Sequence, residues 1–118
     1  MIFCVEDDDN IRELVVYTLE TAGLKACGFP EGTAFMEALA SELPDLVLMD
    51  VMLPGEDGME LLRKLKRTER TRDIPVIMVT GEPDNELEKQ AFALGAADII
   101  YKPFDPDVVY GFASKYIQ

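Results

Sequence analysis

Histidine and tryptophan are both absent from this sequence of 118 residues. Without imidazole side chains, zinc sites built on histidine and catalytic triads with a histidine base are excluded. Basic residues are also scarce, because 11 lysines and arginines stand against 23 aspartates and glutamates, for a formal net charge of -12. Such a charge repels the phosphate backbone of nucleic acids, so we expect no direct binding of DNA or RNA.

Cysteines and long apolar runs are few as well. Cys4 and Cys27 lie in short apolar stretches without CxxC spacing, so we expect both thiols to be reduced and buried in the core. No stretch is long and apolar enough to span a bilayer, and the amino terminus lacks the basic region and long apolar run of a signal peptide. We therefore expect a cytoplasmic protein without membrane contact.

Short apolar runs alternate five times with longer amphipathic stretches, and neither a Ser/Gly-rich linker nor an internal repeat interrupts them. This pattern predicts one (βα)5 domain over residues 1–118, because 48% hydrophobic residues suffice for a single core. The predicted strands are Ile2–Val5, Lys25–Phe29, Leu46–Met49, Val76–Val79 and Asp98–Tyr101.

The helices are predicted from their apolar periodicity and their end signals. The first should be capped by Asp9 or Asn10 and should turn one face to the core. That face consists of Ile11, Leu14, Val15, Thr18, Leu19 and Ala22. The other four helices should cover about residues 32–41, 59–67, 85–94 and 107–116.

Strands and helices that alternate in this way are joined by right-handed crossovers, which place helices on both faces of a parallel sheet. We therefore predict a doubly wound three-layer α/β sandwich with the strand order 2-1-3-4-5. In such sheets, ligands bind outside the carboxyl ends of the strands, near the point where the strand order reverses. The loops after the first and third strands should flank that point.

Polar side chains follow four of the predicted strands at this edge. Glu6 and Asp7 end the first strand, Asp50 the third, Thr80 the fourth and Lys102 the fifth. A pair of like charges ~4 Å apart costs on the order of 4 kcal/mol at an effective dielectric of about 20, so clustered carboxylates need a cation between them. Oxygen ligands without thiolate or imidazole suit a hard ion such as Mg²⁺, although Ca²⁺ stays open.

A carboxylate beside such an ion can act as a nucleophile toward phosphorus, while the metal and an ammonium group neutralise the charge on the transferring oxygens. Asp50 and Lys102 fit these two roles. Thr80 offers a hydroxyl that can donate a hydrogen bond to a phosphoryl oxygen, and Gly81 leaves room for a backbone N–H to approach. The residues therefore indicate transfer of a phosphoryl group to Asp50.

Other polar and small residues near this edge are expected to have structural roles only. Asp8 extends the acidic run, but its expected use is helix capping or solvation rather than metal binding. Pro54, Gly55 and Gly58 should shape the turn after Asp50, because proline presets one dihedral angle and glycine allows positive ones.

Four segments resemble the matching segments of response-regulator receiver domains of bacterial two-component systems. These segments are VEDDDN, PDLVLMDVMLPGEDG, VIMVTGE and IIYKPF, and together they span nearly the whole chain. The resemblance implies a flavodoxin-like fold and a Mg²⁺ ion as cofactor. It implies the metal ligands Glu6, Asp7, Asp50 and the backbone carbonyl of Met52. It also implies that Asp50 is the phosphoacceptor, Lys102 the site lysine, Thr80 and Tyr101 the switch residues, and Lys102–Pro103 a cis peptide.

By the same resemblance the protein is a signalling switch rather than an enzyme. A histidine kinase or phosphotransfer protein would phosphorylate Asp50, and the surface of the fourth helix, fifth strand and fifth helix would control a downstream effector domain or protein. Metal-assisted self-phosphorylation and self-dephosphorylation are also expected. Ala97 and Phe112 replace the aspartate and arginine typical of transcriptional relatives on this surface, which removes one ion pair of their dimers. A phosphorylation-dependent homodimer stays open.

Three alternatives compete with this interpretation. A phosphatase with an aspartyl-phosphate intermediate would need a DxD pair, but Val51 and Met52 follow Asp50. A flavin-binding module would need a Ser/Thr/Gly-rich phosphate loop after the first strand, where this chain has acidic residues at 6–9. A phosphate-independent docking module on the same fold is not excluded by the sequence, although the complete set of site residues opposes it.

Overall fold

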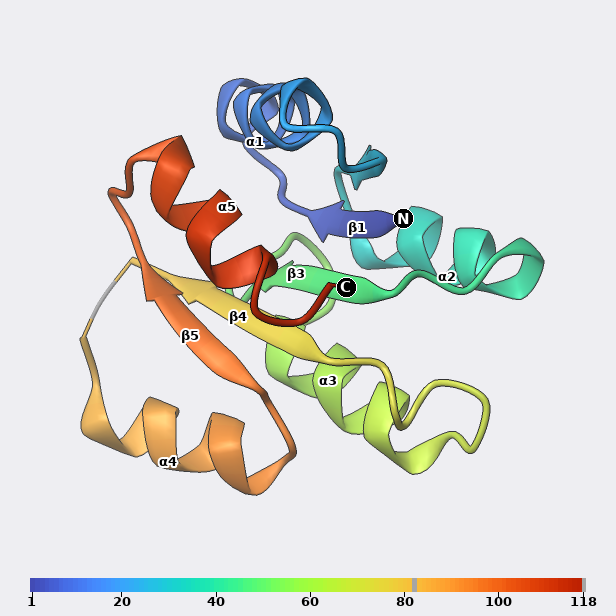
Figure 1. The fold of residues 1–118 in the computed structure, drawn as a ribbon. Coiled ribbons are helices and arrows are strands. Elements are labelled where there is room, and N and C mark those ends of the chain that lie inside the picture. Colours follow the sequence, from blue (N-terminus) through green and yellow to red (C-terminus); the bar gives the residue numbers. More distant parts are fainter. Residues whose placement is uncertain (82, 118) are drawn as a thin grey trace.

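The computed structural model describes residues 1–81 and 83–117. Glu82, the last residue of the VIMVTGE segment, and Gln118 lie outside this description. Strands and helices alternate along the described chain (Figure 1). The strands are β1 (Ile2–Val5), β2 (Ala26–Phe29), β3 (Leu46–Asp50), β4 (Val76–Thr80) and β5 (Asp98–Tyr101). The helices are α1 (Asp9–Thr21), α2 (Gly32–Ser41), α3 (Gly58–Arg67), α4 (Asn85–Ala93) and α5 (Pro106–Ala113).

The strands form one parallel sheet in the order β2-β1-β3-β4-β5. Helices α1 and α5 cover one face of the sheet, and α2, α3 and α4 cover the other (Figure 1). The predicted doubly wound three-layer sandwich with the order 2-1-3-4-5 is therefore confirmed, and the fold is flavodoxin-like. The strand order reverses between β1 and β3, so the loops after these strands flank the expected ligand position.

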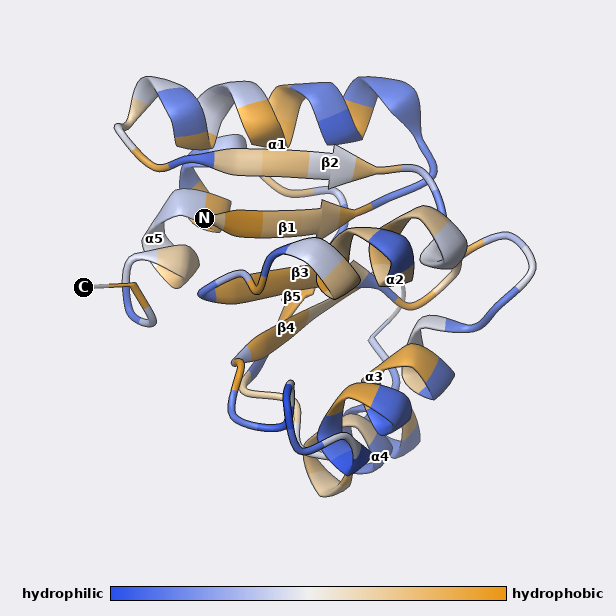
Figure 2. Ribbon diagram, turned by 90° about the vertical axis from the view of Figure 1, so that its right-hand side faces the viewer, coloured by the Kyte–Doolittle hydropathy of each residue, from blue (hydrophilic) through white to orange (hydrophobic). Residues whose placement is uncertain are grey.

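The sheet is apolar on both faces, because helices cover both. Every residue of β1, β3 and β4 is buried, as expected for parallel strands inside a sandwich. Figure 2 shows these apolar strands between helices that carry hydrophilic residues on their outer sides. Phe3 and Phe35 pack in the cluster under α2, α3 and α4, whereas Val15, Leu19 and Val109 pack in the cluster under α1 and α5.

The start of α1 differs from the prediction. Asp8 caps the helix, which was one of its two expected roles, since its side chain accepts a hydrogen bond from the Ile11 N–H at 3.0 Å. The expectation of Asp9 or Asn10 as the cap was wrong. Asp9 lies inside the first turn and pairs with Arg12 instead. The predicted apolar face is correct at Val15 and Leu19, which are buried, but Leu14 is 50% exposed at the rim of a cavity.

The remaining helix bounds agree with the prediction within three residues. The largest difference is at α5, which ends at Ala113 rather than Tyr116. Beyond Ala113 the chain tightens into turns in which the N–H of Tyr116 bonds the Ala113 carbonyl at 3.0 Å. Such shorter-span hydrogen bonds are common at helix ends.

The two cysteines are free thiols on opposite faces of the sheet. Cys4 is buried as predicted, whereas Cys27 is only half-buried, because it lies on β2, beyond which the described part of the chain adds no further strand. Among the described residues, no helix has the length and apolar character needed to cross a bilayer.

The turn after β3 needs glycine at two positions for different reasons. Gly55 has φ +82°, a conformation that glycine adopts without strain. Gly58 begins α3 directly against the end of β3, and a Cβ built on it lies 2.1 Å from the Asp50 carbonyl oxygen. The Gly58 N–H also donates to the Val51 carbonyl at 2.9 Å. These contacts fix the backbone that carries Asp50.

We expect Gly58→Ala to lower the free energy of unfolding by about 1–3 kcal/mol, because the new methyl group must push α3 away from β3. Gly111→Ala is the matched control. A Cβ on Gly111 meets no described atom within 4 Å, and this residue lies inside α5, so alanine should raise stability by roughly 0.5–1 kcal/mol. Urea unfolding followed by circular dichroism measures both. Equal stability of wild type and Gly58→Ala would contradict the close contact.

Candidate functional site

The carboxyl ends of the strands place the predicted site residues at one edge of the sheet. Asp50 and Thr80 are the last residues of β3 and β4, while Glu6 follows β1 and Lys102 follows β5. Glu6 and Asp50 are each 3% exposed and Thr80 is 5% exposed, whereas Asp7 is exposed. Polar groups that are this deeply buried need partners, because water no longer solvates them.

Three carboxylates meet at this edge. Glu6, Asp7 and Asp50 each offer one oxygen, and these oxygens lie within 4.8 Å of one another. The neighbouring Cys4 thiol does not join this set as a thiolate, because burial and then the charge of Glu6 raise the pKa of Cys4 to about 12. The donors are thus carboxylate oxygens alone, which fits a hard divalent cation such as Mg²⁺.

The Lys102 ammonium lies between two of these carboxylates. Its Nζ is 2.6 Å from Glu6 Oε1 and 2.9 Å from Asp50 Oδ2. Burial lowers the pKa of Lys102, but hydrogen bonds to Glu6 and Asp50 outweigh that effect and raise the pKa above its ordinary value. One ammonium does not balance three carboxylates, so the edge keeps a negative charge that attracts a cation.

The buried position of Glu6 disfavours its charged form. Burial raises the pKa of Glu6 to about 7, although hydrogen bonds from Lys102 and from the Asp8 backbone N–H lower it. The Asp8 N–H donates to Glu6 Oε2 at 3.1 Å. Asp50 is held in a similar way, since its Oδ1 accepts a hydrogen bond from the Met52 N–H at 3.1 Å. The role predicted for the Met52 carbonyl stays a prediction.

Thr80 and Tyr101 are register partners in neighbouring strands, so their side chains point to the same face of the sheet. Thr80 lines a cavity of about 340 Å³ between the loops after β3 and β4. Tyr101 is half-buried, and a hydrogen bond to Glu88 of α4, together with burial, raises the pKa of its phenol to about 12. The structure thus brings both predicted switch residues together beside α4.

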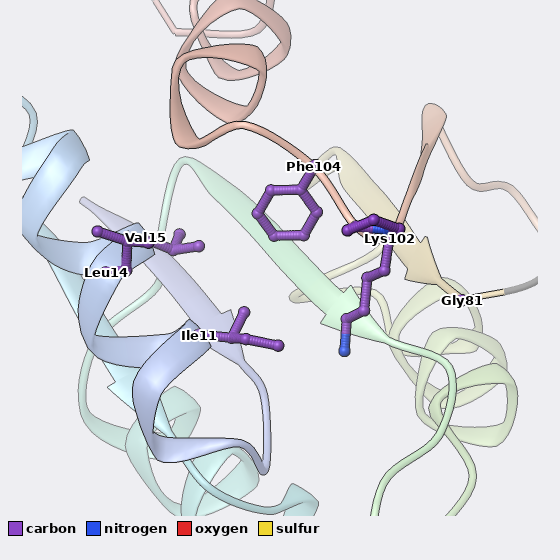
Figure 3. A pocket seen from close by; sticks show the side chains of 7 residues that line it. Ile11, Leu14, Val15, Gly81, Lys102 and Phe104 are labelled. Carbon is purple, nitrogen blue, oxygen red and sulfur yellow. The ribbon is translucent and has the colours of Figure 1, made fainter.

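A second cavity, of about 450 Å³, lies between α1 and the chain after β5. Ile11 and Val15 line it from α1, and Phe104 faces them from the other side, while the Lys102 ammonium points away toward the acidic edge (Figure 3). The Lys102–Pro103 peptide bond is cis, as predicted. Sequence reasoning missed this cavity, because its two walls are far apart in the chain.

Sequence reasoning also missed Arg12. Its Nη1 donates a hydrogen bond to the Glu6 carbonyl oxygen at 2.9 Å, although six positions separate the two residues. The available signal was a single basic residue within the acidic beginning of the first helix, which by itself resembles an ordinary surface arginine.

Comparison with known families settles what this arrangement of residues represents. The sequence model described as "Response regulator receiver domain" matches residues 2–111 of the chain. The chain belongs to the response regulator receiver family. The match includes every residue that the fold brings to the acidic edge, together with both switch candidates. The family was thus correctly inferred from the four segments.

Curated relatives of this receiver domain include transcriptional regulators. The phosphate regulon transcriptional regulatory protein PhoB of Pseudomonas aeruginosa is 47% identical over 108 residues, covering 89% of this chain and 46% of the relative. The DNA-binding transcriptional regulator NtrC of Escherichia coli is 37% identical over 118 residues, covering 100% of this chain and 25% of the relative. The chain therefore spans about half or less of these relatives.

Solved structures agree with the fold. The chemotaxis protein CheY4 of Vibrio cholerae superposes with a TM-score of 0.92 at 24% identity, covering 98% of this chain and 97% of that one. The response regulator DrrB of Thermotoga maritima superposes with a TM-score of 0.88 at 31% identity, covering 98% of this chain and 51% of that one.

We expect Lys102→Met to destabilise the metal-free receiver domain by about 2 kcal/mol. Removing one partner of a buried ion pair costs about 3–5 kcal/mol, and the partial exposure of the lysine reduces this cost. Addition of Mg²⁺ should recover much of the loss, because a divalent ion replaces the missing charge. Thermal unfolding with and without MgCl₂ measures both effects.

The matched control for this variant is Lys89→Met, which removes an exposed lysine from α4. Its stability should stay within about 0.5 kcal/mol of wild type, as is usual for surface substitutions. If Lys102→Met behaved in the same way, the ammonium would not be needed between the carboxylates.

Proposed function

We propose that residues 1–118 form one receiver domain that acts as a phosphorylation-activated signalling switch, with Asp50 as the phosphoacceptor. A histidine kinase or phosphotransfer protein supplies the phosphoryl group. The observation that supports this proposal best is the environment of Asp50, whose buried carboxylate lies within 4.8 Å of two others and 2.9 Å from the Lys102 ammonium. Glu6, Asp7, Asp50 and the Met52 carbonyl are the proposed Mg²⁺ ligands.

In the proposed reaction, a carboxylate oxygen of Asp50 attacks the phosphorus atom of the donor. The bond between phosphorus and the donor nitrogen or oxygen breaks, and the donor leaves with the electron pair. Bound Mg²⁺ supplies neutralisation of charge on the transferring oxygens. Lys102 is already beside Asp50 and can pair with a phosphoryl oxygen, while the Met52 N–H holds the acceptor carboxylate in place. Hydrolysis by attack of water reverses the modification.

The proposed switch uses the residues on the α4 face. A phosphoryl group on Asp50 offers the Thr80 hydroxyl a strong acceptor, and movement of Thr80 makes room for its register partner Tyr101. If the Tyr101 ring turns inward, its interaction with Glu88 is lost and the contact between β5 and α4 changes. This series of movements transmits the charge change at Asp50 to the α4-β5-α5 surface.

The output is proposed to be a downstream effector domain or protein that binds this surface. Val108 and Tyr110 of α5 and Phe92 of α4 are each at least 40% exposed, so the three helix positions offer apolar contacts. Phe112 is covered by Lys115, whose Nζ lies 4.6 Å from the ring centroid. Since the curated relatives with about twice this length or more are transcriptional regulators by name, control of transcription is one proposed output. A homodimer through the same surface is the second.

Incubation with Mg²⁺ and acetyl phosphate should add one phosphoryl group to the wild type, measured as intact mass. Asp50→Asn removes the nucleophile and should abolish this gain, and chelation of Mg²⁺ should suppress it in the wild type. Asp73→Asn is the control, because Asp73 is an exposed aspartate before the opposite end of β4. A gain that persists in Asp50→Asn would remove Asp50 as the acceptor, and no gain at all would favour the phosphate-independent docking module.

The Tyr101 phenol should stay protonated at about pH 11, where an exposed tyrosine with a pKa near 10 is largely ionised. Ring ¹³C NMR shifts of Tyr101, followed through alkaline pH, compare its titration with that of tyrosine in a short peptide. Because the hydrogen bond to Glu88 is the largest cause of the raised pKa, Glu88→Gln should lower the pKa of Tyr101 toward the peptide value. Glu86→Gln on the same helix should leave the pKa of Tyr101 unchanged. Titration of wild-type Tyr101 at the peptide value would disprove the Glu88 contact.

A further inference from the structure

Arg12 joins the start of α1 to the acidic edge. We infer that Arg12 is a positioning residue for Mg²⁺, because its guanidinium fixes the peptide bond between the two candidate ligands Glu6 and Asp7. This inference rests on the proposed function, since it concerns the same metal site. Arg12 itself is not a ligand, and it acts through the backbone that carries the ligands.

The Arg12 side chain is 16% exposed and makes two directed contacts. Nη1 donates to the Glu6 carbonyl oxygen at 2.9 Å, and Nη2 lies 2.6 Å from Asp9 Oδ1. The Asp9 carboxylate thereby holds Nη2, while Nη1 reaches back over the loop to the Glu6 carbonyl. A planar guanidinium can make both contacts together, whereas a lysine ammonium offers donors from a single atom.

The hydrogen bond from Arg12 to the Glu6 carbonyl can orient the backbone because the Glu6 N–H is already held in place. Its N–H donates to the Phe29 carbonyl at 3.0 Å, the last link between β1 and β2. Holding the carbonyl as well fixes the plane of the Glu6–Asp7 peptide. Asp7 is exposed, so packing does not orient its side chain, and the direction of its carboxylate depends on that peptide.

Gly28 has no side chain, and this leaves space for the Arg12 side chain to pass. A Cβ built on Gly28 would lie 2.7 Å from Arg12 Cγ and 2.9 Å from Arg12 Cδ. These atoms belong to the middle of the side chain, whose far end is held by its two contacts. Gly28→Ala must therefore displace Arg12, and it does so without removing its charge. Gly28 has no positive φ, so alanine is compatible with its backbone.

Charge and orientation predict opposite effects of Arg12 on metal binding. A cation beside three carboxylates competes with Mg²⁺, so an effect of charge alone would give tighter binding in Arg12→Gln. An effect of orientation gives weaker binding, because the carboxylates lose their common direction. Groups that orient metal ligands typically contribute 10–100-fold to metal affinity, so we expect roughly tenfold weaker binding in Arg12→Gln.

Titration calorimetry with MgCl₂ tests this on the wild type and on Arg12→Gln, Arg12→Lys and Gly28→Ala. All three variants should bind Mg²⁺ more weakly, although the last two keep the positive charge. Arg67→Gln is the matched control, because it removes an exposed arginine from the end of α3, away from the acidic edge, and should leave the affinity unchanged. The unfolding temperature of each metal-free variant shows whether the fold is intact.

Tighter or unchanged Mg²⁺ binding in Arg12→Gln would overturn the inference. So would wild-type affinity in both Arg12→Lys and Gly28→Ala, because charge alone would then suffice. If Arg12→Gln does not fold, these two variants still decide the question. If the wild-type protein binds no Mg²⁺, the metal site of the proposed function is refuted instead. If the wild type binds Mg²⁺ and the variants bind it equally well, only the role of Arg12 is refuted.

Discussion

The repulsion among three carboxylates at one edge of the sheet is the constraint around which this receiver domain is organised. Two of them, Glu6 and Asp50, are almost fully buried, where water does not weaken their interaction. The Lys102 ammonium offsets part of this charge by contacting both. Backbone N–H groups of Asp8 and Met52 bind further carboxylate oxygens. The negative charge that remains favours a cation at this edge.

The flavodoxin-like fold makes this arrangement possible because a parallel sheet directs all its strand ends the same way. Strands β1, β3 and β4 are buried segments that end at or just before a polar site residue, and Lys102 follows β5 in the same way. The helices on both faces keep these segments in register. The close approach of Gly58 to the Asp50 carbonyl adds a second restraint on Asp50. Precise placement of a few side chains therefore follows from ordinary packing of apolar strands.

Much of this could be predicted from the sequence, since buried strands appear as apolar runs and their ends are marked by Glu6, Asp50 and Thr80. The sequence offered Asp8, Asp9 and Asn10 as caps of the first helix, and only the backbone geometry selects Asp8. The contact of Arg12 could not be predicted from a sequence pattern, because it depends on a backbone carbonyl and on Gly28 in another strand. Such contacts arise only when distant segments meet.

Lys102 and Tyr101 are consecutive residues, yet they serve opposite sides of the sheet. Lys102 lines the cavity beside α1 and contacts the acidic edge, while Tyr101 packs among the residues under α4. A single peptide unit thus separates the ammonium beside Asp50, the proposed phosphoacceptor, from the half-buried aromatic ring under α4. Under the proposed phosphorylation of Asp50, any displacement of the lysine would therefore reach the ring through covalent bonds, without an intervening side chain.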